Sequence, residues 1–187
     1  MSKKGSITTA DYLNFDETTS KALKIIKSGK NSNLGFLVLV GINMGIRIGD
    51  ILTLQYEDFH GDNVVITEKK TKKKRTIRVN ENVREGFNLL KLKTKNETGP
   101  IFRTTRGAIH STQYVNRWLK IHFGSKKINV SSHSLRKTFG RRVWINNNEN
   151  EKALIYLSEL FNHSSLAITK RYLGIRQEEL DDIYMSL

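Results

Sequence analysis

The chain has 187 residues and a formal net charge of +14, with 32 Lys and Arg residues spread along its length. This charge favours a polyanionic partner, and nucleic acid rather than a membrane, because no basic amphipathic segment with an aromatic face stands out. The absence of cysteine excludes disulfides and thiolate metal sites. No apolar run of about 18 residues and no cleavable signal is visible, so a soluble, intracellular protein is expected.

The first segments predict a tail followed by two helices. Residues 1–10 are short, polar and basic, which is typical of a flexible tail or the stub of a linker. Asp16 is the predicted N-cap of a helix that runs through Ile26. Residues 34–44 (LGFLVLVGINM) are almost all apolar but too few to span a bilayer, so we expect the buried central helix there.

A charged pair follows this apolar helix. Arg47 lies between the central helix and another apolar stretch, where a charge is costly unless it is paired or faces an anion. Asp50, three residues further on, can hold the guanidinium if this part is helical. The pattern is compatible with a structural ion pair that fastens two helices, and also with an anion-binding arginine.

Two alternating segments, residues 63–68 and 75–79, predict the strands of a β-hairpin. The run between them (KKTKKK, 69–74) places positive charge at the tip, which suits a groove of nucleic acid. A solvated charge run explains most of these lysines. One of them can also reach a scissile phosphate and donate a proton.

The middle of the chain predicts more helices around a short apolar segment. Asn80 or Asn82 can cap a helix to about Leu92, and Ser111 or Thr112 begins a helix through about His122. Between them, Ile101 and Phe102, which follow the chain's only proline, predict a short buried strand or turn. The remaining histidines with no predicted partner are interpreted as exposed or structural: His60, His110 and His122.

Residues 129–143 (NVSSHSLRKTFGRRV) combine a helix start with two side chains that suit an anion. His133 and Arg136 stand at i and i+3, about 5–6 Å apart at Cβ on one helical face. Ser131 and Ser132 are predicted N-cap residues. The free N–H groups and the positive end of the dipole favour an anion there. The alternatives are a phosphate site that can move a proton, and an ordinary surface helix.

The last third predicts a helix over residues 152–161 and a second one that begins after His163. On one straight helix, His163 and Tyr172 would lie about 13 Å apart. A break at residues 164–165 is therefore needed if both are to contact one phosphate. Taken alone, Tyr172 is better explained as a core aromatic. Residues 178–187 predict a short helix of mixed charge that packs on its own chain or on a neighbour.

Together these segments resemble the catalytic domain of the tyrosine recombinase (phage integrase) family over about residues 11–180. MGIRIGD (44–50) resembles the first arginine box, Lys70-Thr71 the hairpin lysine, and NHSSL (162–166) the later histidine segment. His133-Ser-Leu-Arg136 matches the H-x-x-R box, and Tyr172 falls where the nucleophile belongs. Each box is weak alone, but five in this order are specific.

The resemblance implies an α+β fold: a mostly α-helical single domain over residues 11–187, with a small antiparallel β-sheet of about three strands on one side. It also implies a site-specific recombinase or integrase that cleaves and rejoins DNA through a 3′-phosphotyrosine, with no metal, ATP or other cofactor. The implied catalytic residues are Arg47, Lys70, His133, Arg136, His163 and the nucleophile Tyr172, with Asp50 in support.

The residue chemistry fits these roles. Arg47 and Arg136 would stabilise the nonbridging phosphate oxygens, and guanidinium groups nearby can lower the pKa of Tyr172. Lys70 would protonate the leaving 5′-oxygen, with Lys69 and Lys72 close enough to replace it. His133 is the candidate proton acceptor from Tyr172, and His163 the candidate donor to the phosphate.

The implied partners are double-stranded DNA and further copies of the chain, as a tetramer on DNA, with self-association through the C-terminal helix. The expected location is the cytoplasm, in association with the nucleoid and not with a membrane. The protein is expected to be bacterial or encoded by a phage. The predicted DNA-contacting residues are Lys69, Lys72, Lys73, Lys74 and Arg75.

Some features depart from the family pattern. Asn162 replaces a glycine, Lys137 stands where a second histidine is common, and Arg78 replaces a proline. The N-terminal helical DNA-binding domain usual in the family has no room here, so an excised fragment and a minimal natural version both fit. Two other functions fit the same residues: a type IB topoisomerase-like enzyme, and a catalytically silent basic DNA-binding module. The target site and the type of element are not specified by the sequence.

Overall fold

The computed structural model describes residues 10–186, apart from the side chains of residues 176–178 and 180. Most of the predicted tail, residues 1–9, lies outside this description. Ala10, the last residue of that tail, is buried. The chain that follows it is docked on the C-terminal half, since the Leu13 backbone N–H donates to Thr138 Oγ1 at 2.8 Å.

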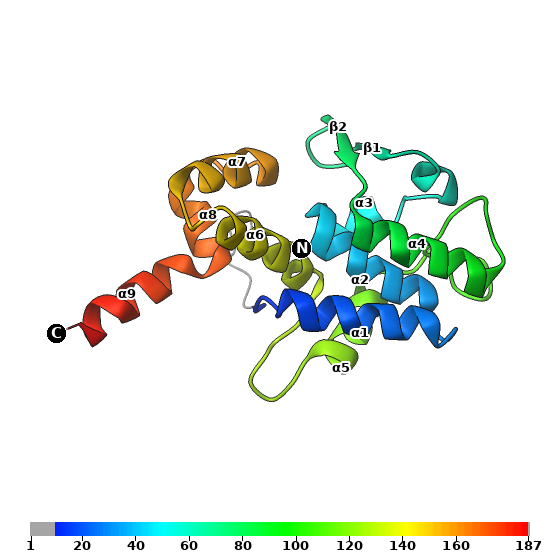
Figure 1. Ribbon diagram of the computed structural model, residues 1–187, viewed down its shortest axis with the longest axis horizontal. Coiled ribbons are helices and arrows are strands. Elements are labelled where there is room, and N and C mark those ends of the chain that lie inside the picture. The colour runs from blue at the N-terminus through cyan, green and yellow to red at the C-terminus, as the bar shows by residue number, and fades with distance from the viewer. Residues whose placement is uncertain (1–9, 187) are drawn as a thin grey trace.

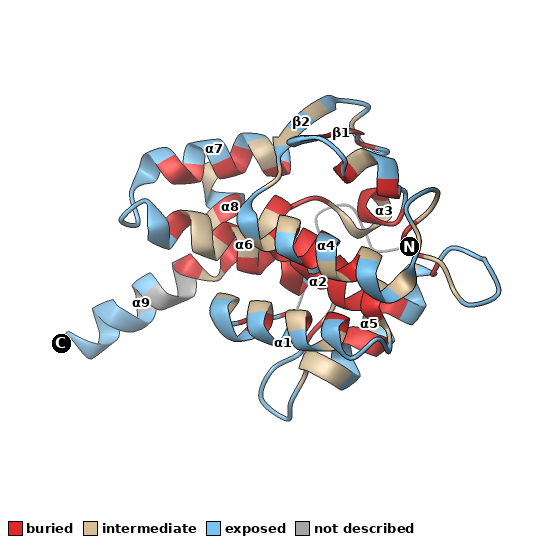
Figure 2. Cartoon of the chain, turned by 45° about the vertical axis from the view of Figure 1, so that its right-hand side comes forward, coloured by how far each residue is buried: buried red, intermediate tan, exposed pale blue. Residues whose placement is uncertain are grey.

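The central element is α2 (Ser32–Met44), which is buried on all sides, as its apolar sequence predicts. It packs against α1 (Phe15–Lys27), α4 (Glu81–Thr94) and α6 (Ser132–Asn146). Figure 1 shows α2 running between α1 and α4, and Figure 2 shows its buried surface at the centre of the molecule.

Side-chain caps place most of the helix starts where the sequence predicts them. Asn80 caps α4, Ser111 caps α5 (Thr112–Phe123), and Ser131 caps α6. The exception is α1, which Asn14 caps in place of the predicted Asp16, because the Asn14 side chain accepts the backbone N–H of Glu17.

The β-hairpin follows α2 through two short helical turns, α3 (Ile48–Ile51) and the 3₁₀ helix η1 (Tyr56–Phe59). Its strands β1 (Asn63–Thr67) and β2 (Lys74–Arg78) pair antiparallel. The mostly helical α+β architecture is confirmed, but the sheet in the described residues has two strands. The third predicted strand is reduced to isolated bridges, Gln55–Pro100 and Arg103–Ile109.

The C-terminal part contains α7 (Glu151–Phe161), α8 (Leu166–Leu173) and α9 (Ile175–Met185). The predicted break at residues 164–165 is present, and Ser165 caps α8. Both α7 and α8 pack on α6 and on each other. In Figure 1, α9 extends away from the rest of the molecule. None of the helices in the described residues is long and apolar enough to cross a membrane.

Two groups of buried apolar side chains hold these elements. The larger core surrounds α2 and includes side chains of α1, α4, α5 and the hairpin, together with Leu135 of α6. The smaller cluster lies between α6, α7 and α8: Trp144, Ala153, Leu154, Leu157, Phe161, Leu173 and Ile175. Close approach of α2 and α6 requires Gly41, because an added Cβ there would lie 2.7 Å from Leu135 Cδ1. The candidate site lies where the two groups meet.

Candidate active site

Arg47 reaches the site from the turn after α2. Gly45 ends α2 with φ +62°, and an added Cβ there would clash with the Phe139 ring, so this turn requires glycine. Arg47 then takes the N-cap position of α3. Its Nη1 donates to Glu68 Oε2 at 2.8 Å and its Nη2 to the Phe161 carbonyl at 3.1 Å. The guanidinium is therefore held between the hairpin and the end of α7.

Arg136 approaches the same helix end from α6. Its side chain is buried, with Cζ 4.4 Å from the centroid of the Phe161 ring and Nη2 3.5 Å from the Leu160 carbonyl. Burial and the charge of Arg47 lower its pKa to about 10, so it stays charged at neutral pH. Its Nη1 is buried and has no hydrogen-bond partner among the described residues. A buried guanidinium donor without a partner is suited to an incoming anion.

The end of α7 exposes the carbonyl groups that the two arginines use. Asn162 takes a left-handed conformation with φ 54° and ψ 50°, and its N–H closes the helix on Glu159 and Ser158. The carbonyls of Leu160 and Phe161 thereby remain available to Arg136 and Arg47. The negative end of the helix dipole favours the two cations at this point.

His163 follows directly and faces the nucleophile candidate. Its Nδ1 lies 3.0 Å from Thr169 Oγ1, and its ring meets the Tyr172 ring edge-to-face at 5.3 Å. Burial and the charges of Arg136, Arg47 and Lys70 lower the pKa of His163 to about 4, so its imidazole is neutral at pH 7. In the tautomer in which Nδ1 accepts from Thr169, Nε2–H is the free donor.

Tyr172 is half-buried between aromatic and cationic groups. Its ring contacts Phe161 edge-to-face at 5.5 Å, and Lys137 Nζ lies 5.4 Å from its centroid. Its hydroxyl is 3.4 Å from the His133 carbonyl, which is long for a hydrogen bond. Burial raises the pKa of Tyr172 to about 12, although Arg136 and Arg47 lower it. The predicted lowering by guanidinium groups is thus outweighed by desolvation.

His133 stands at the start of α6, where its backbone N–H donates to Ser131 Oγ at 3.2 Å. Reduced hydration of the ring and the charges of Arg136 and Lys137 lower its pKa. The Tyr172 hydroxyl lies near the backbone carbonyl of this residue, and a neutral imidazole is able to accept a proton.

The hairpin turn presents Lys70 to this cluster. Lys70 is exposed, and its charge is one of those that lower the pKa of His163, which places it on the side of the site. The predicted DNA-contacting lysines Lys69, Lys72, Lys73 and Lys74 are exposed as well. Arg75 differs from them, because it is half-buried and its Nη1 donates to Glu68 Oε1 at 2.9 Å.

The carboxylate that bonds Arg47 is Glu68 and not Asp50. The sequence predicts Asp50 as the support, from helical spacing. In the structure Asp50 Oδ1 accepts the backbone N–H of Lys69 at 2.9 Å, and its Oδ2 has no partner among the described residues. Asp50 therefore fixes the base of the hairpin turn, and the ion pair comes from Glu68.

Strand periodicity contained a signal for Glu68. Val64 and Ile66 point into the core, so the alternation of β1 places residue 68 on the same inward face. A carboxylate at an inward position needs a cationic partner. Glu68 was predicted only as the end of a strand and not as a site residue.

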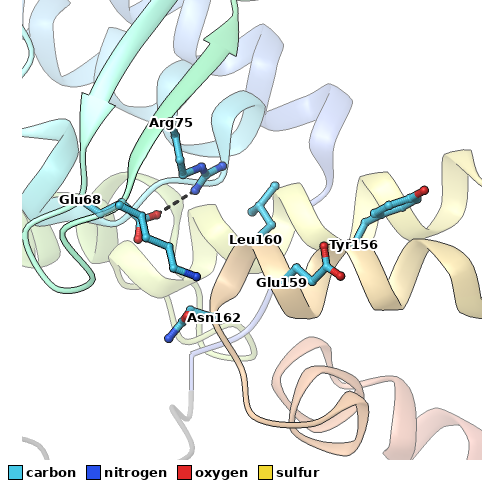
Figure 3. A pocket seen from close by; sticks show the side chains of 7 residues that line it. Glu68, Arg75, Tyr156, Glu159, Leu160 and Asn162 are labelled. Atoms are coloured by element: carbon cyan, nitrogen blue, oxygen red, sulfur yellow. Dashed lines mark hydrogen bonds and ion pairs between the residues drawn. The ribbon is translucent and has the colours of Figure 1, made fainter.

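A cavity of about 370 Å³ separates the hairpin from α7 beside this ion pair. Figure 3 shows Glu68 joined to Arg75 on one side, with Leu160 and Asn162 facing them. The other side chains on the α7 wall are Tyr156 and Glu159.

Groups outside the cluster have other roles. His110 is buried and stacks on Tyr114, and His122 stacks on Trp118, so both are structural, as predicted. Within the described part of the chain, no group of three or more His, Asp and Glu residues could hold a metal ion.

Comparison with known proteins identifies relatives of this chain. Residues 13–179 match the phage integrase family. The probable integrase/recombinase YoeC of Bacillus subtilis (strain 168) is 35% identical over 153 residues, which are 80% of this chain and 81% of that protein.

Two solved structures illustrate the likeness of fold. XerA recombinase superposes with a TM-score of 0.66 at 20% identity, covering 96% of this chain and 65% of that one. The lambda integrase catalytic core gives a TM-score of 0.58 at 19% identity, covering 82% of this chain and 91% of that one. The chain thus spans 65% of XerA and most of an isolated catalytic core.

Proposed function

Because the chain belongs to the phage integrase family, we propose that it is a site-specific DNA recombinase that cleaves and rejoins strands through a 3′-phosphotyrosine. The observation that carries the proposal is the buried Nη1 of Arg136, which has no hydrogen-bond partner in the part of the chain that the structure describes. It lies in one cluster with Arg47, His163 and Tyr172, which supplies an anion-binding donor beside a phenol.

The proposed reaction begins with attack of the Tyr172 hydroxyl oxygen on the phosphorus. His133 accepts the phenol proton as the bond forms, which is needed because burial raises the pKa of Tyr172 to about 12. Arg47 and Arg136 stabilise the charge on the nonbridging oxygens, and the Nε2–H of His163 donates a hydrogen bond to the phosphate. Lys70 protonates the 5′-oxygen as its bond to phosphorus breaks.

The covalent bond keeps the energy of the cleaved linkage. A 5′-hydroxyl from a second strand can therefore attack the phosphotyrosine, release Tyr172 and be joined in place of the first. This sequence needs neither ATP nor a metal ion, and it exchanges strands when the second hydroxyl belongs to another duplex.

Double-stranded DNA is the proposed substrate, and a tetramer on DNA the proposed assembly. Support comes from the exposed lysines of the hairpin and from a structural neighbour, a lambda integrase tetramer bound to a Holliday junction. The end of α9 offers a surface for self-association, since Ile183, Tyr184 and Met185 are exposed there. The proposed location is the cytoplasm of a bacterium, on the nucleoid.

The test traps the covalent intermediate. A pool of nicked duplexes with randomised sequence around the nick is incubated with the protein, and adducts are resolved on denaturing gels. Cleavage next to the nick releases a short fragment that carries the 5′-hydroxyl. Once this fragment has diffused away, the attack cannot be reversed and adducts accumulate. We expect adducts with the intact chain and none with Tyr172→Phe, which keeps the ring but has no nucleophile.

Two outcomes contradict the proposal. Adducts that persist in Tyr172→Phe would refute the nucleophile, and no adduct with the intact chain would favour a silent DNA-binding module. Strand transfer is then measured by adding an oligonucleotide with a free 5′-hydroxyl. Relaxation of supercoiled DNA without transfer would point to a topoisomerase-like enzyme.

A further inference from the structure

Glu68 is a buried carboxylate that the reaction described above does not use. It is 2% exposed, and it lies where β1 enters the hairpin turn. Its Oε2 accepts from Arg47 Nη1 at 2.8 Å and from Thr71 Oγ1 at 2.6 Å, and its Oε1 accepts from Arg75 Nη1 at 2.9 Å. Both oxygens are therefore engaged by charged or polar donors.

The same residue closes the turn that carries the hairpin lysines. Its backbone N–H donates to the Lys73 carbonyl at 3.0 Å, and its carbonyl accepts the Lys72 N–H at 2.8 Å. Burial raises the pKa of Glu68, but hydrogen bonds from Thr71, Arg75 and Arg47 lower it to about 2. Glu68 thus carries a full negative charge at neutral pH inside a strongly basic site.

Two hydrogen bonds hold the Arg47 guanidinium, and they differ in strength. One is the charged bond to Glu68 at 2.8 Å, and the other is the neutral Phe161 carbonyl at 3.1 Å. Without the carboxylate charge, the guanidinium would keep only the weaker contact. The repulsion between Arg47 and Arg136, whose pKa the charge of Arg47 lowers, would then have no carboxylate to oppose it.

From these contacts, and on the basis of the proposed function, we infer that Glu68 is a positioning residue that orients the Arg47 guanidinium towards the scissile phosphate. It acts through Arg47 and does not touch the DNA. Arg75 and Thr71 in turn fix the Glu68 carboxylate, so the two strands of the hairpin and α3 hold one catalytic arginine together.

The first test compares Glu68→Gln with Glu159→Gln in the trapping assay. Glu159→Gln removes one negative charge from the same cavity, as Glu68→Gln does. Glu159 is exposed on the opposite wall and has no ion pair in the described part of the chain, so it serves as the matched control. We expect Glu68→Gln to lower the cleavage rate about 10²-fold, the scale of a misplaced catalytic group. Glu159→Gln should stay within about twofold.

A double-mutant cycle shows whether the effect passes through Arg47. If it does, Glu68→Gln adds no further loss to Arg47→Ala, whereas additive losses overturn the inference. A DNA substrate with a methylphosphonate at the scissile position has lost the oxygen charge that Arg47 stabilises. The Glu68→Gln defect should shrink on it as the Arg47→Ala defect does, and a general structural defect would not shrink.

A third measurement needs no cleavage. Nitrogen NMR signals of the Arg47 side chain report rotation of its guanidinium, which we expect to be slow in wild type and in Glu159→Gln, and fast in Glu68→Gln. Unchanged rotation in Glu68→Gln overturns the inference. An intact chain that forms no adduct instead counts against the proposed function. If Glu68→Gln does not fold, Glu68→Asp enters the same cycle and the same NMR comparison, with the same expected coupling.

Discussion

The larger core and the smaller cluster make different contributions to the site. The larger core surrounds a fully buried α2 and holds Arg47 and the hairpin, and it also anchors the start of α6 through Leu135. The smaller cluster contains few buried side chains and carries His163 and Tyr172 on α8 and the turn before it. On the proposed roles, the larger core fixes the segment that carries Arg47, and the smaller cluster fixes the proposed nucleophile Tyr172.

This difference has a consequence for motion. Local opening costs less free energy where fewer apolar contacts are lost, so α8 should open more readily than α2. The proposed reaction needs Tyr172 to be presented and later released while the charges of Arg47 and Arg136 stay in place. The division of the fold between the two groups meets both needs.

Arg136 joins the two groups, and its removal should have the largest effect among the following substitutions. It starts from α6, next to Leu135 of the larger core, and lies over Phe161 of the smaller cluster. We expect Arg136→Ala to lower the adduct-forming rate by about 10²–10³-fold, or roughly 3 kcal/mol, as for loss of one preorganised donor. Single-turnover cleavage of the nicked duplex pool measures it.

Arg142→Ala is the matched control, because this arginine is on the same helix and makes a solvent-exposed ion pair with Asp16 at 3.4 Å. It should leave cleavage nearly unchanged. Equal losses in both variants would mean that α6 itself, and not the buried guanidinium, limits the rate.

Acid should separate the two groups. The pKa of His163 falls from 6.5 to about 4 on folding, so the unfolded state binds more protons and stability decreases as pH falls from 6.5 to 4. The pKa of Glu68 falls from 4.5 to about 2, so its contribution is present above pH 4.5 and is lost between 4.5 and 2. The smaller cluster should therefore weaken first on acidification.

The two tryptophans of the chain allow this to be measured. Trp118 lies in the larger core and Trp144 in the smaller cluster. When one of them is replaced by Phe, the fluorescence of the other reports on its own group. Denaturant unfolding is followed from pH 7 to 3. His163→Gln should make the free energy of unfolding reported by Trp144 less dependent on pH above pH 4. Glu68→Gln should do the same below pH 4.5 for the value reported by Trp118. Identical profiles for both tryptophans would remove the distinction between the groups.

Sequence patterns predicted what depends on local residues. The apolar run over 34–44 identified the buried helix, and the serines at 131 and 165 marked helix starts, because capping is decided within one turn. The partner of Arg47 could not be predicted in this way. Spacing pointed to Asp50, but the carboxylate that arrives is Glu68, 21 positions along the chain. Its placement depends on how the hairpin folds back over α3.

The third strand failed for a related reason. Ile101 and Phe102 were predicted to form a short buried strand or a turn; both are buried, and the chain turns there after one bridge on each side. Likewise, nearby arginines were predicted to lower the pKa of Tyr172, and they do, but by less than an opposing effect raises it. The opposing effect, desolvation, depends on the packing of Phe161 and His163 around the ring, which no local pattern specifies.

The smallest effect is expected at Asn162, where the family usually has glycine. Its φ of 54° lies in the left-handed region, which Gly adopts freely, Asn tolerates, and Ala adopts at a cost of about 1 kcal/mol. Asn162→Gly should be within a few tenths of a kcal/mol of wild type, and Asn162→Ala about 1 kcal/mol less stable, by Trp144-monitored unfolding. Equal stabilities of the Gly and Ala variants would show that the helix ends in another way.

Cleavage should respond to Asn162→Ala more than stability does. The left-handed residue directs its N–H back to Glu159 and Ser158, and so leaves the Leu160 and Phe161 carbonyls for the two arginines. If α7 continued in a right-handed conformation through residue 162, both carbonyls would turn with it and the guanidinium groups would lose a contact. A loss of cleavage no greater than the loss of folded protein would show that the arginines are held by Glu68 and Phe161 packing alone.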